Sequence, residues 1–120
     1  MQTLPVVSLD YAADHLLDAV RSVAVSEGPV QTRFQSVWDE SVQHVWEKPC
    51  LTTELLARFK VLWDRVTDPT AGPRSTRLRE LTASEAVAAV EELIALAVQT
   101  AVTASQAPPD VRLATLADLT

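Results

Sequence analysis

Apolar residues recur at alternating steps of three and four along most of this 120-residue chain. This spacing places them on one face of a helix, because an α-helix completes a turn every 3.6 residues. The chain also holds only two glycines, whereas a sheet-rich fold of this size needs many tight turns, which consume glycine. Together these features predict an all-α fold, a compact bundle of four main helices that forms a single domain over residues 1–120.

The four helices are expected over residues 8–26, 29–46, 53–66 and 83–104. Gly28 and Pro29 separate the first two helices, since proline is well tolerated at a first helical position. Thr82 and Glu85 have the spacing of a capping box at the start of the fourth helix. In that motif the threonine oxygen accepts from the Glu85 amide, and the Glu85 side chain reaches back to the amide of Thr82.

The fourth helix is unusually apolar. The spacing predicts that its buried face comprises Val87, Val90, Ile94, Ala97, Val98 and Ala101, with Leu93 and Leu96 widening it. A helix of this kind lies at the centre of a bundle or across a dimer interface, so a homodimer through it remains an alternative. A short fifth helix is expected through Val111, Leu113, Leu116 and Leu119, in a segment (107–120) that either folds back or stays mobile.

Cys50 is the only cysteine, so the chain cannot form an internal disulfide, which fits a reducing cytosol. The N-terminus lacks the basic and then apolar pattern of a signal peptide. The most apolar stretch, residues 86–102, contains Glu91 and Glu92 and has the minimum length for crossing a bilayer. We therefore expect a cytoplasmic protein that does not associate with a membrane.

Charge is unevenly distributed around a net value of −6. Residues 1–47 carry seven acidic and two basic side chains, residues 48–79 three acidic and seven basic, and residues 80–120 six acidic and one basic. The basic middle segment can pack against its acidic neighbours or present a local basic surface.

Two features of the first two helices suggest a surface that binds another protein. Asp10, Asp14 and Asp18 form an acidic row at steps of four, which is either a solvated face or a docking surface for a basic partner. Trp46 lies at the edge of its apolar stripe, and tryptophan is enriched at interfaces. Trp38 and Trp63 fall within apolar stripes and are expected in the core.

A cluster of arginines precedes the fourth helix. Arg74, Arg77 and Arg79 lie close to a helix N-terminus, where guanidinium groups and free amides together favour phosphate or nucleic acid. The alternative is a solvated loop whose arginines pair with nearby acids such as Glu80 and Glu85.

Two histidine–acid pairs, His15 with Asp18 and His44 with Glu47, have the spacing of helical metal ligands, and Glu40 could assist the second pair. Helical geometry turns both pairs away from the apolar stripes, and the chain has no further histidine to complete a ligand shell. Cys50 could act as a nucleophile if Lys48 or His44 activated it, but a partly buried structural cysteine is the expected role. We expect no metal, cofactor or catalytic site, with a helical-bundle metalloenzyme using His15 and His44 as the third hypothesis.

The stretch from Arg79 to Ala86, followed by Val90 and Leu93, resembles helix openings of small phage- and plasmid-encoded proteins. The resemblance implies a mobile-element origin and, by analogy, an inhibitor of a host defence complex such as an anti-CRISPR protein. The resulting hypothesis is stoichiometric binding of a partner protein, as an inhibitor or adaptor and not as an enzyme. The alternative is a nucleic-acid-associated protein that uses the arginine cluster.

Overall fold

The four predicted helices are all present, and the all-α fold is confirmed. The computed structural model describes residues 8–46, 50–68, 70–71, 76–108 and 111–114. The elements in chain order are α1 (Leu9–Val25), α2 (Val30–Val37), the π-helical η1 (Trp38–Val42), α3 (Gln43–Trp46), α4 (Thr53–Val66), the 3-10 helix η2 (Leu78–Glu80) and α5 (Ala83–Gln106).

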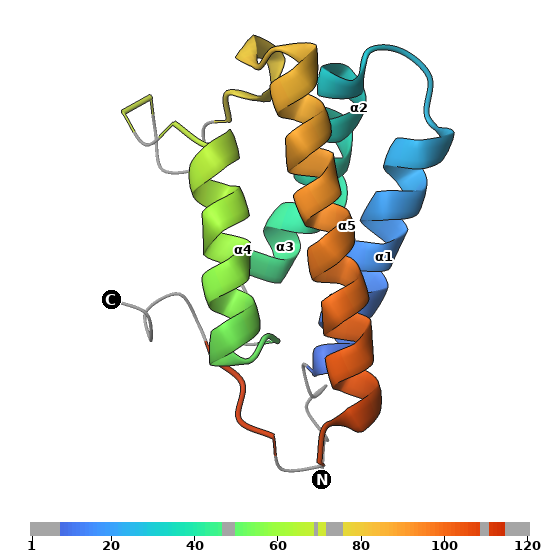
Figure 1. Ribbon diagram of the computed structural model, residues 1–120, viewed down its shortest axis with the longest axis vertical. Helices are drawn as coiled ribbons and strands as arrows, with labels where there is room; N and C mark the ends of the chain where they lie inside the picture. The colour runs from blue at the N-terminus through green and yellow to red at the C-terminus, as the bar shows by residue number, and fades with distance from the viewer. Residues whose placement is uncertain (1–7, 47–49, 69, 72–75, 109–110, 115–120) are drawn as a thin grey trace, which may run out of the picture.

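Helix α5 organises the bundle. It runs between α4 and α1, with α2 and α3 behind it (Figure 1). Its most extensive packing is with α1, which runs in the opposite direction, and it also contacts α4 and α2. The first and last helices of the described chain therefore form the main contact of the fold.

Hydroxyl side chains fix the N-terminal ends of three helices. Ser8 accepts a hydrogen bond from the Tyr11 amide at the start of α1, and Thr52 accepts one from the Leu55 amide at the start of α4. The predicted capping box of α5 is confirmed: the Glu85 amide donates to Thr82 Oγ1 at 3.1 Å, and the Thr82 amide donates to Glu85 Oε1 at 3.0 Å.

The second predicted helix is continuous from residue 30 to 46, but its middle turn is wider than an α-helix. In η1 the hydrogen-bond pattern is that of a π-helix, which the apolar spacing did not signal. Gly28 and Pro29 separate the first two helices as predicted, but Pro29 is the N-cap of α2 and not its first helical residue. Gly28 adopts a φ of +100°, a conformation that residues with a side chain rarely adopt.

An aromatic cluster joins this second segment to α4. The Trp38 ring lies 5.3 Å from the ring of Trp63, 6.1 Å from Phe34 and 6.4 Å from Phe59. All four side chains are buried. The prediction that Trp38 and Trp63 belong to the core is confirmed, and their burial supplies much of the apolar area that stabilises this side of the bundle.

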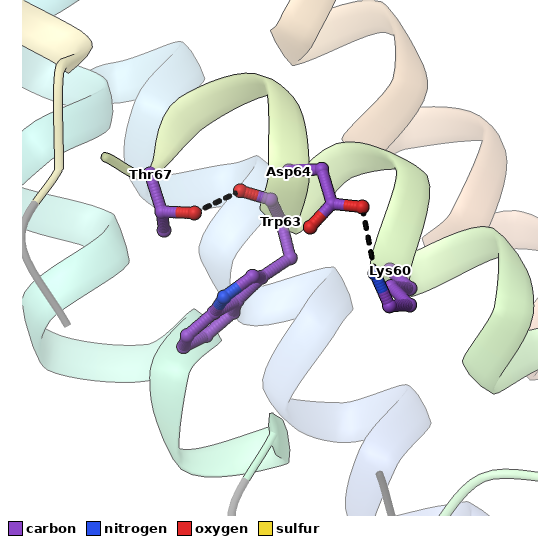
Figure 2. A network of polar contacts seen from close by, with 4 residues as sticks. All are labelled: Lys60, Trp63, Asp64 and Thr67. Atoms are coloured by element: carbon purple, nitrogen blue, oxygen red, sulfur yellow. Dashed lines mark hydrogen bonds and ion pairs between the residues drawn. The ribbon is translucent and has the colours of Figure 1, made fainter. Parts of the chain in front are cut away.

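Helix α4 separates a buried face from a solvated one (Figure 2). Trp63 points away from the exposed ion pair of Lys60 and Asp64, whose N–O distance is 2.8 Å. At the end of the helix the Trp63 carbonyl accepts two hydrogen bonds from Thr67, one from its amide at 3.0 Å and one from its hydroxyl at 2.7 Å.

The buried face of α5 differs from the prediction. Val87, Ile94 and Val98, which were expected on the buried face, are exposed, with 46%, 41% and 53% of their surface accessible. The residues that are buried are Ala86, Ala89, Leu93, Leu96, Ala97 and Thr100. Apolar residues surround most of this helix, so periodicity alone could not select the face, and small alanines allow close packing against α1.

The predicted fifth helix is not formed in the part that the structure describes. Residues 111–114 are not helical, and the Ala114 amide donates to the Leu51 carbonyl at 2.8 Å in an isolated antiparallel bridge. Leu116 and Leu119 lie outside the described residues. The segment therefore folds back against the start of α4, as one of the two expected alternatives, without forming a helix at 111–114.

Candidate protein-binding surfaces

The acidic row of α1 lies on the outer surface of the bundle. Asp10, Asp14 and Asp18 are all exposed, on successive turns. Their position follows from the sequence, because the buried face of α1 is occupied by Leu9, Ala12, Leu16, Ala19 and Val23, on the other side of the helix.

Beside this row the surface of α1 forms an open concavity of about 370 Å³, lined by Tyr11, Asp14, His15 and Asp18. The Tyr11 and His15 rings meet edge to face, with centroids 4.2 Å apart, and both residues are half-buried. The sequence signalled the carboxylates, and His15 only as a metal ligand, but not Tyr11, whose ring meets that of His15 because the two residues are four apart on one helix face.

We call this concavity the α1 pocket, defined by the same four residues. Its aromatic rings flanked by carboxylates suit a cationic side chain. An arginine can stack its guanidinium on an aromatic face while pairing with a carboxylate through two parallel hydrogen bonds. Lysine can make the charge contact but not the planar, bidentate one.

The arginine cluster is brought close to acidic groups. Arg77 and Arg79 are exposed, whereas Arg74 lies outside the described residues. Arg77 lines an open concavity of about 400 Å³ together with Arg65, Glu85 and Ala88. Arg65 in turn forms an ion pair with Glu92 at 2.9 Å.

Arg77 lies close enough to two carboxylates for its charge to lower their pKa. The pKa of Glu85 is lowered, chiefly because its carboxylate accepts from the Thr82 amide, and further by the Thr82 hydroxyl and the Arg77 charge. The pKa of Asp68 is lowered by its hydrogen bonds from Thr70 and, to a smaller extent, by Arg77. The choice between an anion-binding cluster and a solvated loop whose arginines pair with nearby acids stays a prediction.

The remaining sequence candidates do not gather into one site. Among the described residues, no group of three or more His, Cys, Asp or Glu side chains has a metal-binding arrangement. His44 is exposed on α3, and Glu47 lies outside the described residues. Cys50 is fully buried, and its thiol donates to the Val45 carbonyl at 3.5 Å.

Trp46 ends α3, but its side chain lies outside the part of the structure that is described, so its predicted role at an interface stays a prediction.

The sequence did not predict a second exposed surface, which is apolar and lies on α5. Val87, Ile94, Val98 and Val102 of α5 are each between 41% and 53% exposed. We call these four residues the α5 stripe. By length and composition alone, α5 is long and apolar enough to cross a membrane. Core helices of soluble proteins meet the same two criteria. The apolar spacing of the sequence contained this signal, since all four residues recur at helical steps, but spacing does not distinguish a buried from an exposed apolar face.

In comparisons with known proteins, the chain matches no protein-family model, no curated protein and no solved structure.

Proposed function

We propose that this protein acts by stoichiometric binding to a partner protein that presents a basic surface, as an inhibitor or adaptor. The observation that carries the proposal is the α1 pocket, which brings the edge-to-face pair of Tyr11 and His15 together with the exposed Asp14 and Asp18. The pocket lies beside the exposed Asp10, so an approaching basic surface meets three carboxylates along one helix.

The chemistry of the pocket favours an arginine of the partner as the inserted side chain. Tyrosine and arginine are both enriched among the residues that carry most of the binding energy at protein interfaces. The protein's net charge of −6 would also attract a basic partner from a distance and speed association.

Proteins that bind nucleic acid are one class of partner with an arginine-rich surface. The resemblance of residues 79–86 to phage- and plasmid-encoded proteins directs the first search to defence complexes of the host. An acidic helix on such a complex would occupy the surface that nucleic acid otherwise uses.

The direct test uses a fluorescently labelled arginine-rich peptide and a lysine-rich peptide of equal length and charge. We expect the arginine peptide to bind more tightly, and the double change Asp14→Asn with Asp18→Asn to raise its Kd about tenfold or more, since hydrogen bonds to charged groups contribute about 1.5–3 kcal/mol. Tyr11→Ala should remove the preference for arginine over lysine.

The matched control is Glu27→Gln with Glu80→Gln, which removes the same charge from two exposed positions outside the pocket. If the control weakened binding as much as the pocket variant, the interaction would depend only on net charge, and the proposed site would be wrong. Retention of the wild type on heparin, lost on changing Arg77 and Arg79 to alanine, would favour the nucleic-acid alternative instead.

A further inference from the structure

We infer that α5 also pairs with α5 of a second copy of this chain, in antiparallel orientation, through the α5 stripe. This surface is separate from the α1 pocket, so the inference does not depend on the proposed function. It begins from the exposure of four large branched side chains on one helix: Val87 at 46%, Ile94 at 41%, Val98 at 53% and Val102 at 49%. Contiguous exposed apolar surface of this kind marks an interaction site in soluble proteins.

The neighbouring helices leave the stripe uncovered. Glu92 reaches Arg65, which fixes the side of α5 that faces α4. Ile94 is about 200° further around the helix, because each residue advances by about 100°. Figure 1 shows α5 in front of α2 and α3, on the near side of the bundle.

The outward face of α5 has the spacing of a coiled-coil seam. Its residues follow one another at alternating steps of three and four: Ser84, Val87, Glu91, Ile94, Val98, Ala101 and Ser105. Such a seam packs against a second helix by inserting each side chain between four residues of its partner. A two-fold axis near Leu96 would place Ile94 of each copy opposite Val98 of the other.

Charge selects the antiparallel orientation. The acidic residues of α5 all lie in its first half, at Glu85, Glu91 and Glu92, and residues 93–106 carry no charge. In a parallel pair the two copies of Glu91 would lie side by side and repel each other. In the antiparallel pair Glu91 lies opposite Ala101 of the other copy, and the two helix dipoles oppose each other favourably.

The size of the surface predicts a weak dimer. A helix of 24 residues is about 36 Å long and about 10 Å wide, so pairing two of them buries roughly 700 Å² in total. Stable interfaces bury about 1,200 Å² or more. The pair should therefore form and dissociate with protein concentration, and should not be needed for folding.

The first experiment is sedimentation velocity of the full chain over a concentration series. We expect a reversible monomer–dimer equilibrium, and we expect Ile94→Glu and Val98→Glu each to raise the dimer Kd at least tenfold. Val25→Glu is the matched control, because Val25 is 74% exposed but lies at the end of α1. Unchanged circular dichroism and melting temperature would show that the α5 variants remain folded.

The second experiment tests orientation by oxidising single-cysteine variants, with the native Cys50 buried and so protected from cross-linking. A mixture of Val87→Cys and Ser105→Cys should form a disulfide between the two variants. Val87→Cys alone should not, because the antiparallel pair separates its two copies by about 27 Å along the helix axis, far beyond the reach of a disulfide.

Several results would overturn the inference. These are a monomer at every concentration, a dimer that Ile94→Glu leaves intact, and efficient cross-linking of Val87→Cys to itself. Cosedimentation of a monomer with phosphatidylcholine vesicles would assign the stripe to a lipid surface instead. Asp14→Asn with Asp18→Asn should dimerise normally, so failure of the proposed function and failure of this inference can be told apart.

Discussion

Trp38 is fully buried at the junction of α2 and η1, where it contacts rings from its own segment and from α4. Its indole Nε1, like Nε of Arg33, is buried without a hydrogen-bond partner among the described residues. The contribution of Trp38 to stability therefore comes from packing and not from its polar atom.

We expect Trp38→Ala to lower the free energy of unfolding by about 3–5 kcal/mol, because it removes the centre of the aromatic cluster and leaves a cavity. Chemical denaturation followed by circular dichroism measures the change. Val61→Ala serves as the control, since Val61 is 56% exposed, and it should alter stability by no more than about 0.5 kcal/mol. Equal effects from the two variants would contradict the assigned core.

The Glu85 carboxyl group makes the stability of the protein depend on pH. Its pKa is lowered from the ordinary value of 4.5, first by the Thr82 amide, then by the Thr82 hydroxyl, and by Arg77. A carboxyl whose pKa is lower in the folded state stabilises the protein above the unfolded pKa, and this contribution disappears as the pH falls through the folded pKa.

The stability of the wild type relative to Glu85→Gln should therefore be greatest near neutral pH and should shrink as the pH falls below 4.5. Thermal melts of both proteins at matched pH values provide the measurement. A difference that stayed constant through this range would show that the ionised carboxylate is not what stabilises the start of α5. Thr82→Ala should separately cost about 1 kcal/mol through loss of the helix cap.

At the scale of the elements, α5 shows how two adjacent residues can have opposite roles. Leu93 is fully buried, whereas Ile94 is 41% exposed. Both are large and apolar, and both fit a helical pattern. Only the position of α1 and α4 around α5 determines which of them belongs to the core.

Leu93→Asp should unfold the domain, because burying an unpaired carboxylate costs several kcal/mol, out of a total stability of about 5–15 kcal/mol. Ile94→Asp should keep the helical circular dichroism and a melting temperature close to that of the wild type, while weakening the dimer. The reverse outcome would mean that α5 is rotated relative to the structure described here.

Sequence patterns predicted the elements where local chemistry decides the outcome. The capping box at Thr82 and the break between the first two helices at Gly28 and Pro29 depend on residues close together in the chain, and both are as expected. The orientation of α5 and the course of residues 111–114 depend on distant helices, which no local pattern reports. The four residues of the α1 pocket lie on one helix, and helical spacing alone brings them together, but the sequence pattern drew attention to Asp14, His15 and Asp18 without Tyr11.

At the scale of the whole molecule, the two proposed surfaces differ in chemistry. The α1 pocket is acidic and should meet a partner of opposite charge, whereas the α5 stripe is apolar and should meet an identical molecule of the same net charge, −6. Attraction between unlike charges and repulsion between like charges are both screened by salt.

Raising the salt concentration should therefore weaken binding of the arginine-rich peptide and strengthen dimerisation of the protein. Fluorescence anisotropy and sedimentation velocity, performed at about 50 and about 500 mM salt, measure the two trends. If both equilibria shifted in the same direction, a single surface would be serving both interactions, and the separation between the α1 pocket and the α5 stripe would have to be abandoned.

The close packing of α1 with α5 also has a consequence for synthesis on the ribosome. Helix α1 ends at Val25, but the surface that covers it is not complete until Gln106 has been added. At about 5–20 residues per second, the nascent α1 waits roughly 4–16 s for its partner. During this interval its apolar face is open to chaperones, so codon changes that slow translation between the two helices should increase aggregation without altering the finished protein.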